Sequence, residues 1–146
     1  MATETTEPLL LACAGCLTAN RVPAARLADD PKCGKCGAAL LPGKPVALDD
    51  ASFDSFISHT ELPVLVDFWA GWCAPCRMMA PAFERAAEEL RYQVRLVKVD
   101  TEAAPRTSVR YRIRSIPTLI LFRGGQEVKR ASGALDARSI ARFAQQ

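Results

Sequence analysis

The sequence predicts an α/β fold in which a mixed β-sheet carries helices on both faces, preceded by a small zinc-ribbon-like segment with four cysteines. From residue 46 onward, apolar runs typical of buried strands alternate with helical patterns. Four of the six cysteines form two Cys-x-x-Cys pairs before residue 37. The 146 residues, 49% of them hydrophobic, suffice for one domain with an appendage and exclude a disordered chain or a fibrous repeat. We therefore divide the chain into a segment 1–45 and a unit 46–146.

The charge and the histidine content narrow the classes of function. The 19 basic and 16 acidic residues give a net charge of +3, and the basic residues form no block. We therefore expect no nucleic-acid partner. The single histidine, His59, excludes a site built on several histidines, and we expect it to be a solvated residue at the end of a helix.

The N-terminal residues do not resemble a secretory signal. The first ten include two glutamates and no lysine or arginine, and the apolar run Leu9–Ala12 is short. This run ends at Cys13 in a pattern like a bacterial lipoprotein cleavage site, which the same two features disfavour. No stretch approaches the ~20 apolar residues of a spanning helix. We expect a cytoplasmic protein without membrane contact, whose thiols stay reduced unless they bind metal or perform redox chemistry.

Two pairs of cysteines in the first segment have the spacing of a zinc site. The pairs read C-A-G-C and C-G-K-C, with sixteen residues between them. Two cysteines three positions apart in a tight turn direct both sulfurs to one centre, and Gly15, Gly34 and Gly37 permit such turns. Two turns complete a tetrahedral site of four thiolates. We predict that one zinc ion per chain is bound by Cys13, Cys16, Cys33 and Cys36.

The composition of segment 1–45 favours a structural metal. The segment has five prolines and no aromatic residue, so it cannot bury a core that would fold it unaided. Binding of a structural zinc ion supplies about 10–16 kcal/mol. Four thiolates leave no position for water, which favours a structural over a catalytic role. Two disulfides, or free thiols, are the alternatives.

The first elements of unit 46–146 are a short strand, a helix, a buried strand and a long helix. Val46–Leu48 is extended, and Asp50 or Ser52 is expected to cap a helix that ends at Thr60. The run 64–69 is apolar except for Asp67 and reads as a buried strand. A helix from 73 to about 91, kinked at Pro81, follows. Its apolar face comprises Met78, Met79, Ala82, Phe83, Ala86, Ala87 and Leu90, and we interpret the two methionines as core residues.

The remaining elements complete the sheet. Residues 94–100 alternate as V-R-L-V-K-V-D, which is typical of a strand, and 103–111 reads as a short helix. An apolar strand at 118–122 leads through Gly124-Gly125 into a second strand at 127–131. An amphipathic helix at 136–143 follows.

The third cysteine pair is suited to redox chemistry. Cys73 lies where a buried strand gives way to a helix, and the unpaired N–H groups and dipole of the helix start favour its thiolate. Cys76 lies one turn further on the same face, so the two can form a disulfide. Pro75 suits the first helical turn. Trp72 offers a flat apolar surface for a partner polypeptide, whereas Trp69 is expected to be a core residue.

Three motifs of this unit resemble thioredoxin. They are V-D-F-W-A at 66–70, W-C-A-P-C at 72–76 and R-S-I-P-T at 114–118. The resemblance runs from about residue 46 to the end. With the first segment, including N-R-V-P at 20–23 and C-G-K-C-G at 33–37, the whole chain resembles the zinc-containing second thioredoxin of bacteria. It departs from the family at Ala74, which replaces a glycine that helps to tune the redox potential, and at Gly71, where a larger residue is usual.

The resemblance implies a thioredoxin-like fold and a mechanism. The Ile116–Pro117 peptide is expected to be cis and to face the active cysteines. The Cys73 thiolate attacks a substrate disulfide, and Cys76 resolves the mixed disulfide. Asp67 is assigned to proton transfer at Cys76 through water, its pKa raised by desolvation, with Lys98 as a modulator. The alternative is a carboxylate with a purely structural role. The residues expected at the substrate surface are Trp72, Ala74, Pro75, Ile116 and Pro117.

The sequence thus predicts a protein disulfide reductase. The resemblance implies that NADPH-dependent thioredoxin reductase recharges it, that disulfide-bearing proteins are its substrates and that no organic cofactor is bound. We expect a monomer. Two alternatives are a disulfide oxidase or isomerase, which a secretory signal would favour, and a zinc-binding adaptor or redox sensor with secondary oxidoreductase activity.

Overall fold

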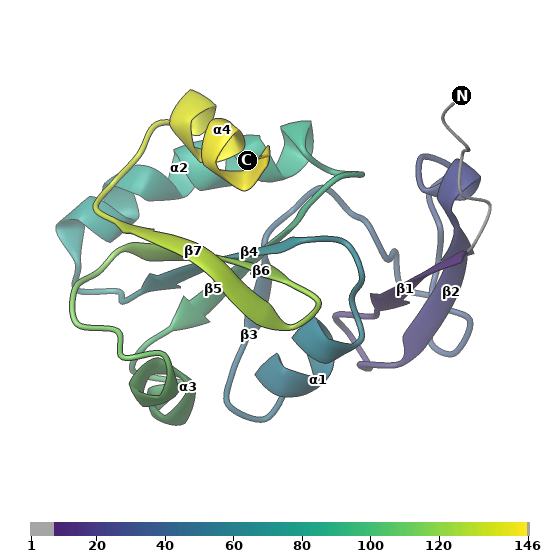
Figure 1. Cartoon of the computed structure of the whole chain (residues 1–146), viewed down its shortest axis with the longest axis horizontal. Coiled ribbons are helices and arrows are strands. Elements are labelled where there is room, and N and C mark those ends of the chain that lie inside the picture. Colours follow the sequence, from purple (N-terminus) through teal and green to yellow (C-terminus); the bar gives the residue numbers. More distant parts are fainter. Residues whose placement is uncertain (1–7, 146) are drawn as a thin grey trace.

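The computed structural model, which describes residues 8–145, contains a small ribbon followed by a larger α/β unit (Figure 1). The ribbon, residues 8–41, includes the antiparallel hairpin of β1 (Pro8–Ala12) and β2 (Ala19–Pro23) and the short helix η1 (Ala24–Arg26). The α/β unit begins at β3 (Val46–Leu48). This arrangement confirms the predicted fold class.

The α/β unit is built on a five-stranded sheet with the order β3-β5-β4-β6-β7. Strands β3, β5 and β4 are parallel, whereas β6 and β7 run antiparallel to their neighbours. Gly124 and Gly125 connect β6 to β7, both with positive φ, as the predicted two-residue hairpin turn requires. The four remaining strands are β4 (Val64–Trp69), β5 (Arg95–Asp100), β6 (Thr118–Arg123) and β7 (Gln126–Ser132).

Two helices cover each face of the sheet. Helices α2 (Ala74–Glu89) and α4 (Ala137–Gln145) pack on one face through Phe83, Leu65 and Ile140. Helices α1 (Phe53–Ser58) and α3 (Pro105–Arg110) lie on the other (Figure 1). The core of that second face includes Phe53, Phe56, Val66, Phe68, Val97, Val99 and Phe122. Among residues 8–145, no helix is long and apolar enough to cross a membrane.

The structure corrects the expected cap of α1. Ser52 precedes the helix but accepts no capping hydrogen bond, and the Asp49 carboxylate instead accepts the backbone N–H of Ser52 at 3.0 Å. Asp50 faces a different helix. Its carboxylate accepts the backbone N–H groups of Arg106 and Thr107 at the start of α3, at 3.1 and 2.8 Å. Asp50 therefore caps α3, which follows it by more than fifty residues.

The expectation that both methionines of α2 are core residues is wrong for one of them. Met79 is buried against the sheet, but Met78 is 79% exposed. Adjacent helical positions differ by about 100°, so the apolar face cannot include both. His59 is exposed and ends α1, as expected, and Trp69 is only partly buried.

Strands β1 and β2 are not evident from the sequence. In β1 only the last two residues, Leu11 and Ala12, are buried, so this strand does not alternate. Strand β2 alternates in exposure, but Val22 is its only buried residue. The run that ends in the lipoprotein-like pattern forms β1 and leads into Cys13, which is itself fully buried.

The ribbon shares an apolar cluster with the α/β unit. Segment 1–45 cannot form a core by itself, and the structure supplies the missing apolar partners from Leu62, just before β4, and Tyr92, just after α2. The ribbon therefore packs against the end of the sheet where β4 and β5 begin. Its residues in the cluster are Leu9, Leu11, Cys13, Cys16, Val22, Leu27, Cys33, Leu40 and Leu41.

Polar contacts surround this shared cluster. The backbone N–H of Leu10 donates to the Glu61 carboxylate at 2.7 Å, and the backbone N–H of Glu61 donates to the Leu10 carbonyl at 2.8 Å. Arg91 donates through Nε to the Leu41 carbonyl at 2.8 Å and through Nη2 to Asp30 at 2.9 Å. The ribbon is thus held by the side chains of Glu61 and Arg91, which are about fifty residues away from their partners in the sequence.

Candidate active site and metal centre

The redox cysteines occupy the start of α2. Cys73 is the N-terminal cap residue and Cys76 lies in the first turn, with Pro75 between them at a position that needs no N–H partner. Both are buried, their Cα atoms are 5.3 Å apart, and they form a disulfide. The backbone N–H of Cys76 points at the Cys73 sulfur, 3.2 Å away. The end of the helix therefore directs its unpaired N–H groups toward this sulfur.

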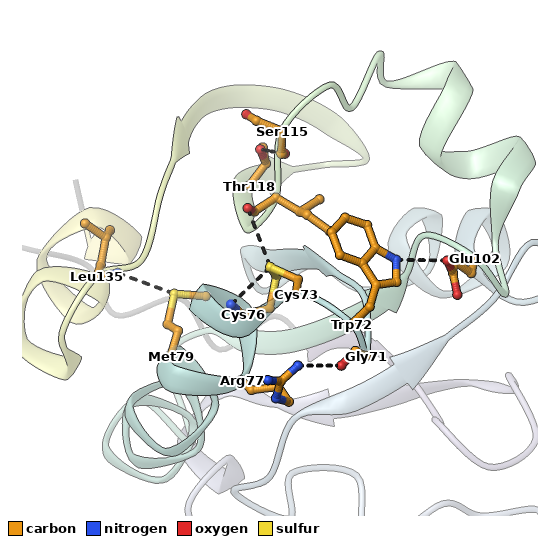
Figure 2. Close-up of a disulfide and its surroundings, with 11 residues drawn as sticks. Gly71, Trp72, Cys73, Cys76, Arg77, Met79, Glu102, Ser115, Thr118 and Leu135 are labelled. Atoms are coloured by element: carbon orange, nitrogen blue, oxygen red, sulfur yellow. Dashed lines mark hydrogen bonds between the residues drawn. A yellow bond between two sulfur atoms is a disulfide. The ribbon is translucent and has the colours of Figure 1, made fainter.

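The residues that the sequence predicts at the substrate-binding surface lie around this disulfide. The Cys73 sulfur lies 3.7 Å from the carbonyl oxygen of Ile116, and the Ile116–Pro117 peptide is cis, as expected. Figure 2 shows Trp72 beside the disulfide, 67% exposed. Ala74 is also exposed, as is Pro75.

Two contacts that the sequence does not indicate hold this region. Trp72 donates through Nε1 to the carboxylate of Glu102, 2.9 Å away, and Arg77 donates to the carbonyl of Gly71 at 2.8 Å (Figure 2). Glu102 is thirty residues from Trp72 and belongs to none of the motifs. The indole is therefore held in position while its ring stays accessible.

Asp67 is buried under the helix that carries Cys76. Its place in β4 puts it on the same sheet face as Leu65, the face covered by α2. It is 1% exposed, and neither carboxylate oxygen has a hydrogen-bond partner among residues 8–145. Desolvation raises the pKa of Asp67 to about 7, although the Lys98 charge acts to lower it. The desolvated carboxylate thus titrates near neutral pH.

Lys98 is the cross-strand neighbour of Asp67. The two residues pair in the parallel register of β4 and β5. The Lys98 ammonium also lies 4.4 Å from the centre of the Trp69 ring, a cation–π contact. Lys98 therefore contributes a positive charge close to Asp67 without forming a salt bridge to it.

The four cysteines of the ribbon converge on one centre. Their sulfurs all lie within 4.8 Å of one another. Cys13 and Cys36 are 3.5 Å apart at the sulfurs, and Cys16 and Cys33 are 3.6 Å apart. Sulfurs bound to zinc at about 2.3 Å in a tetrahedron are separated by roughly 3.8 Å. The donor set and its dimensions therefore fit a tetrahedral zinc ion.

The two cysteine turns have the same internal bonding. The N–H of Leu17 donates to the Cys13 carbonyl at 2.8 Å, and that of Gly37 donates to the Cys33 carbonyl at 2.9 Å. Both residues have positive φ, 65° at Leu17 and 81° at Gly37. Gly15, which we expected to permit the first turn, does not have positive φ. Leu17 takes this conformation instead, and its side chain packs against the core of the α/β unit.

The local environment of these sulfurs is suited to a cation. Backbone N–H donation from Cys36 lowers the pKa of the Cys33 thiol to about 6. For Cys36, the N–H of Ala38 acts to lower the pKa, but the Cys13 sulfur and burial raise it to about 11. Four thiolates this close repel one another, and a divalent metal offsets that repulsion.

The redox pair and the cysteine cluster lie at opposite ends of the sheet. In Figure 1, α2 begins at the left, where Cys73 and Cys76 lie, and the ribbon hairpin lies at the right. Cys73 follows the C-terminal end of β4, whereas Leu62 precedes the same strand and packs against the ribbon. The ribbon therefore leaves the surface around Trp72 uncovered.

Comparisons with known proteins agree with these two sites. Residues 44–146 match the family model described as Thioredoxin, and residues 12–38 match the one described as Thioredoxin 2, N-terminal. Thioredoxin C-3 of Corynebacterium nephridii is 50% identical over 127 residues, 87% of each chain. A thioredoxin of Synechocystis is 47% identical over 94 residues, 64% of this chain and 88% of its own.

A third relative of this chain is named for two activities, thioredoxin reductase and thioredoxin. The bifunctional thioredoxin reductase/thioredoxin of Mycobacterium leprae is 44% identical over 100 residues, 68% of this chain but 22% of its own. The matches thus cover both the ribbon and the α/β unit, and the Cys-x-x-Cys pair occupies the start of α2. This chain belongs to the thioredoxin family, as a disulfide reductase with a Cys-x-x-Cys active site and the N-terminal zinc ribbon of thioredoxin 2.

Proposed function

We propose that Cys73 is the nucleophile and Cys76 the resolving thiol of this reductase. The Cys73 thiolate attacks one sulfur of a substrate disulfide, forms a mixed disulfide and releases the other sulfur as a thiolate, which takes up a proton. Cys76 then attacks Cys73, so that the substrate leaves as a dithiol and the pair is oxidised. The observation that carries this assignment is the position of Cys73 at the helix cap, with its sulfur accepting the N–H of Cys76.

Asp67 is the proton acceptor for Cys76 in this proposal. A thiol attacks only as a thiolate, and Cys76 is a buried residue of α2, the helix that covers Asp67. A carboxyl group with a pKa of about 7 can accept and return a proton near neutral pH. Neither carboxylate oxygen has a hydrogen-bond partner among residues 8–145, so either can accept the proton, directly or through a water, in this role.

The substrate docks on the surface around the disulfide. Trp72, Ala74 and Pro75 are exposed beside it, and the Ile116 carbonyl faces the Cys73 sulfur. An extended substrate segment can therefore pair with the backbone at Ile116 while its disulfide meets Cys73. Pro117 keeps a backbone N–H from competing there, since proline has none.

We further propose that thioredoxin reductase supplies the electrons, from NADPH. The Mycobacterium leprae relative, whose name joins both activities in one chain, supports this pairing. We place the protein in the cytoplasm as a monomer, without a nucleic-acid partner. A reducing compartment would also keep the ribbon cysteines available as metal ligands.

The metal of the ribbon is proposed to be zinc in a structural role. Cys13, Cys16, Cys33 and Cys36 hold it, and a closed set of four thiolates leaves no position for a reacting water. The four ribbon cysteines and the redox pair lie at opposite ends of the sheet. This separation supports a division of the chain into segment 1–45 and unit 46–146, which have separate tasks. Measuring zinc per chain and reductase-coupled insulin reduction on one preparation tests both; a metal-free active protein contradicts the zinc assignment, and an inactive zinc protein contradicts the reductase assignment.

Asp67→Asn is expected to slow resolution by Cys76 by about tenfold or more near pH 7.5, because it removes the proton acceptor. In the parent protein the rate rises as Asp67 ionises through pH 7. In the variant the rate rises only at higher pH, as Cys76 ionises without the help of a carboxylate. Stopped-flow measurement of mixed-disulfide decay from pH 6 to 10 should show the difference closing above pH 9. An equal loss at every pH would indicate a packing role.

The same substitution is expected to stabilise the fold at alkaline pH. The pKa of Asp67 is higher in the folded chain than the 3.8 of an aspartate in the unfolded chain. The free energy of unfolding therefore falls as pH rises from about 4 through 7. The difference between the folded and unfolded pKa values of Asp67 corresponds to roughly 4 kcal/mol in the free energy of unfolding. Urea unfolding should therefore show Asp67→Asn more stable than the parent at pH 8 and no such gain at pH 4. A pH-independent difference would contradict the burial of an ionised carboxylate.

A further inference from the structure

Arg95 is a buried arginine beneath the ribbon. It opens β5 at the end of the sheet where the ribbon docks, and it is 3% exposed. Its Nη1 donates to the carbonyl of Leu40, and the guanidinium lies over the ring of Phe56, 5.3 Å from the ring centre. Its Nη2 has no hydrogen-bond partner, and no carboxylate forms a salt bridge with it, among residues 8–145.

A guanidinium in this position needs a negative charge nearby. Arginine stays protonated in proteins, and a buried unpaired cation costs several kcal/mol. The Leu40 carbonyl and the Phe56 ring contribute only partial charges. Within residues 8–145 the structure therefore leaves a buried positive charge that its hydrogen bonds do not balance.

The cysteine cluster lies on this side of the sheet and carries negative charge when its thiols ionise to bind a metal. Cys13 is fully buried and belongs to the same apolar cluster as Leu40, which follows Cys36 by four residues. Thr60 donates to the carbonyl of Phe56, the residue under the guanidinium, and accepts the N–H of Ala12, which precedes Cys13 in the chain. Burial lowers the pKa of Arg95 to about 10, and the charge of Cys13 acts to raise it. Four thiolates with one divalent cation carry a net charge of about −2.

We propose that Arg95 is the counter-ion of the metal–thiolate centre and thereby links metal binding in the ribbon to docking of the ribbon on the sheet. The inference rests on the zinc site proposed above. With metal bound, all four sulfurs are thiolates, and the buried guanidinium faces an anionic centre. Because coupling is reciprocal, the charge that stabilises the docked ribbon also tightens the metal. Arg95 touches no reacting atom and acts as a positioning residue.

Arg95→Met tests the charge, and Arg91→Met is the matched control. Arg91 also donates to a ribbon carbonyl, that of Leu41, but its side chain is 32% exposed and already paired with Asp30. The probe is Co²⁺, titrated under anaerobic reducing conditions into the full chain against a competing chelator, with its thiolate absorption as the readout. Arg95→Met is expected to weaken Co²⁺ affinity about tenfold or more, as loss of a charged neighbour of a metal site does. Arg91→Met is expected to stay within about twofold, since its charge is solvated.

Thermal unfolding of metal-loaded and metal-free protein separates this role from simple packing. Arg95→Met should lower the midpoint of the loaded protein but leave that of the metal-free protein equal or higher, because methionine removes an uncompensated buried charge. Equal losses in both states, or unchanged Co²⁺ affinity, would overturn the counter-ion proposal while the metal site stands. A parent chain that takes up no Co²⁺ would overturn the metal site and the proposal together.

Discussion

Cys73→Ser is expected to abolish disulfide reduction, whereas Cys76→Ser should accumulate mixed disulfides with its substrates. The helix start lowers the free energy of the Cys73 thiolate through its N–H groups and dipole. Cys76 lies one turn inside the helix, where it can reach Cys73 but is buried from a protein substrate. Without Cys76 the first step therefore proceeds and the second cannot.

Mass spectrometry of each variant after incubation with a disulfide-bonded protein measures this difference. The Cys76→Ser variant should carry one covalent adduct, at Cys73, that dithiothreitol releases. The ribbon cysteines need a control, because they too are thiols when metal is absent. The same adduct should therefore form in zinc-loaded protein. Adducts on Cys73→Ser but not on Cys76→Ser would reverse the assignment.

Replacing all four ribbon cysteines by serine is expected to remove the metal and undock the ribbon, yet preserve disulfide reduction. Serine hydroxyls do not replace thiolates, so about one zinc ion per chain and roughly 10–16 kcal/mol of binding free energy are lost. Undocking exposes the apolar cluster that includes Leu40, Leu41 and Leu62. The redox pair lies at the opposite end of the sheet, and the α/β unit keeps its own apolar cores on both faces of that sheet. Its activity should therefore stay within about twofold of the parent.

Limited proteolysis, zinc content and insulin reduction together test this prediction. Cleavage should concentrate before residue 46 in the quadruple variant, since that backbone loses its packing. Unfolding should also begin at a lower temperature, because Leu62 and Tyr92 lose apolar partners. Lys35→Ser, within the second turn but not a ligand, is the control and should keep its zinc. A folded quadruple variant without reductase activity would show that the two parts are coupled, and retained metal would place the site elsewhere.

The elements that depend on neighbouring residues were predictable. The strand at 64–69 has the predicted bounds, and the long helix begins within one residue of its predicted start. The Gly124-Gly125 turn follows from the backbone freedom of glycine. The redox pair and the metal site both depend on cysteines three positions apart. A turn or a helix start brings the sulfurs of such a pair close together. The raised pKa of Asp67 follows from one carboxylate within an apolar run.

Other contacts required the folded chain. Asp50 caps α3 rather than the helix next to it, and Glu102 holds Trp72 from thirty residues away. Leu17 adopts positive φ, an unfavourable conformation for leucine, while its side chain contacts a core formed mostly by later residues. Each of these depends on a partner brought close by the sheet order rather than by the sequence.

The sequence by itself determined where the cysteines of this protein pair by spacing, which pair lies at the start of a helix, and which buried strand carries a carboxylate. Local spacing and apolar patterning suffice for that, because they act over a few residues. Only the tertiary structure decided where the ribbon docks and what lies beneath it. Arg95 reads in the sequence as the polar position of an alternating strand, and folding instead buries its charge under Leu40, because the ribbon covers that end of β5. Burial is a property of all the chain that surrounds a residue, and no local pattern contains it.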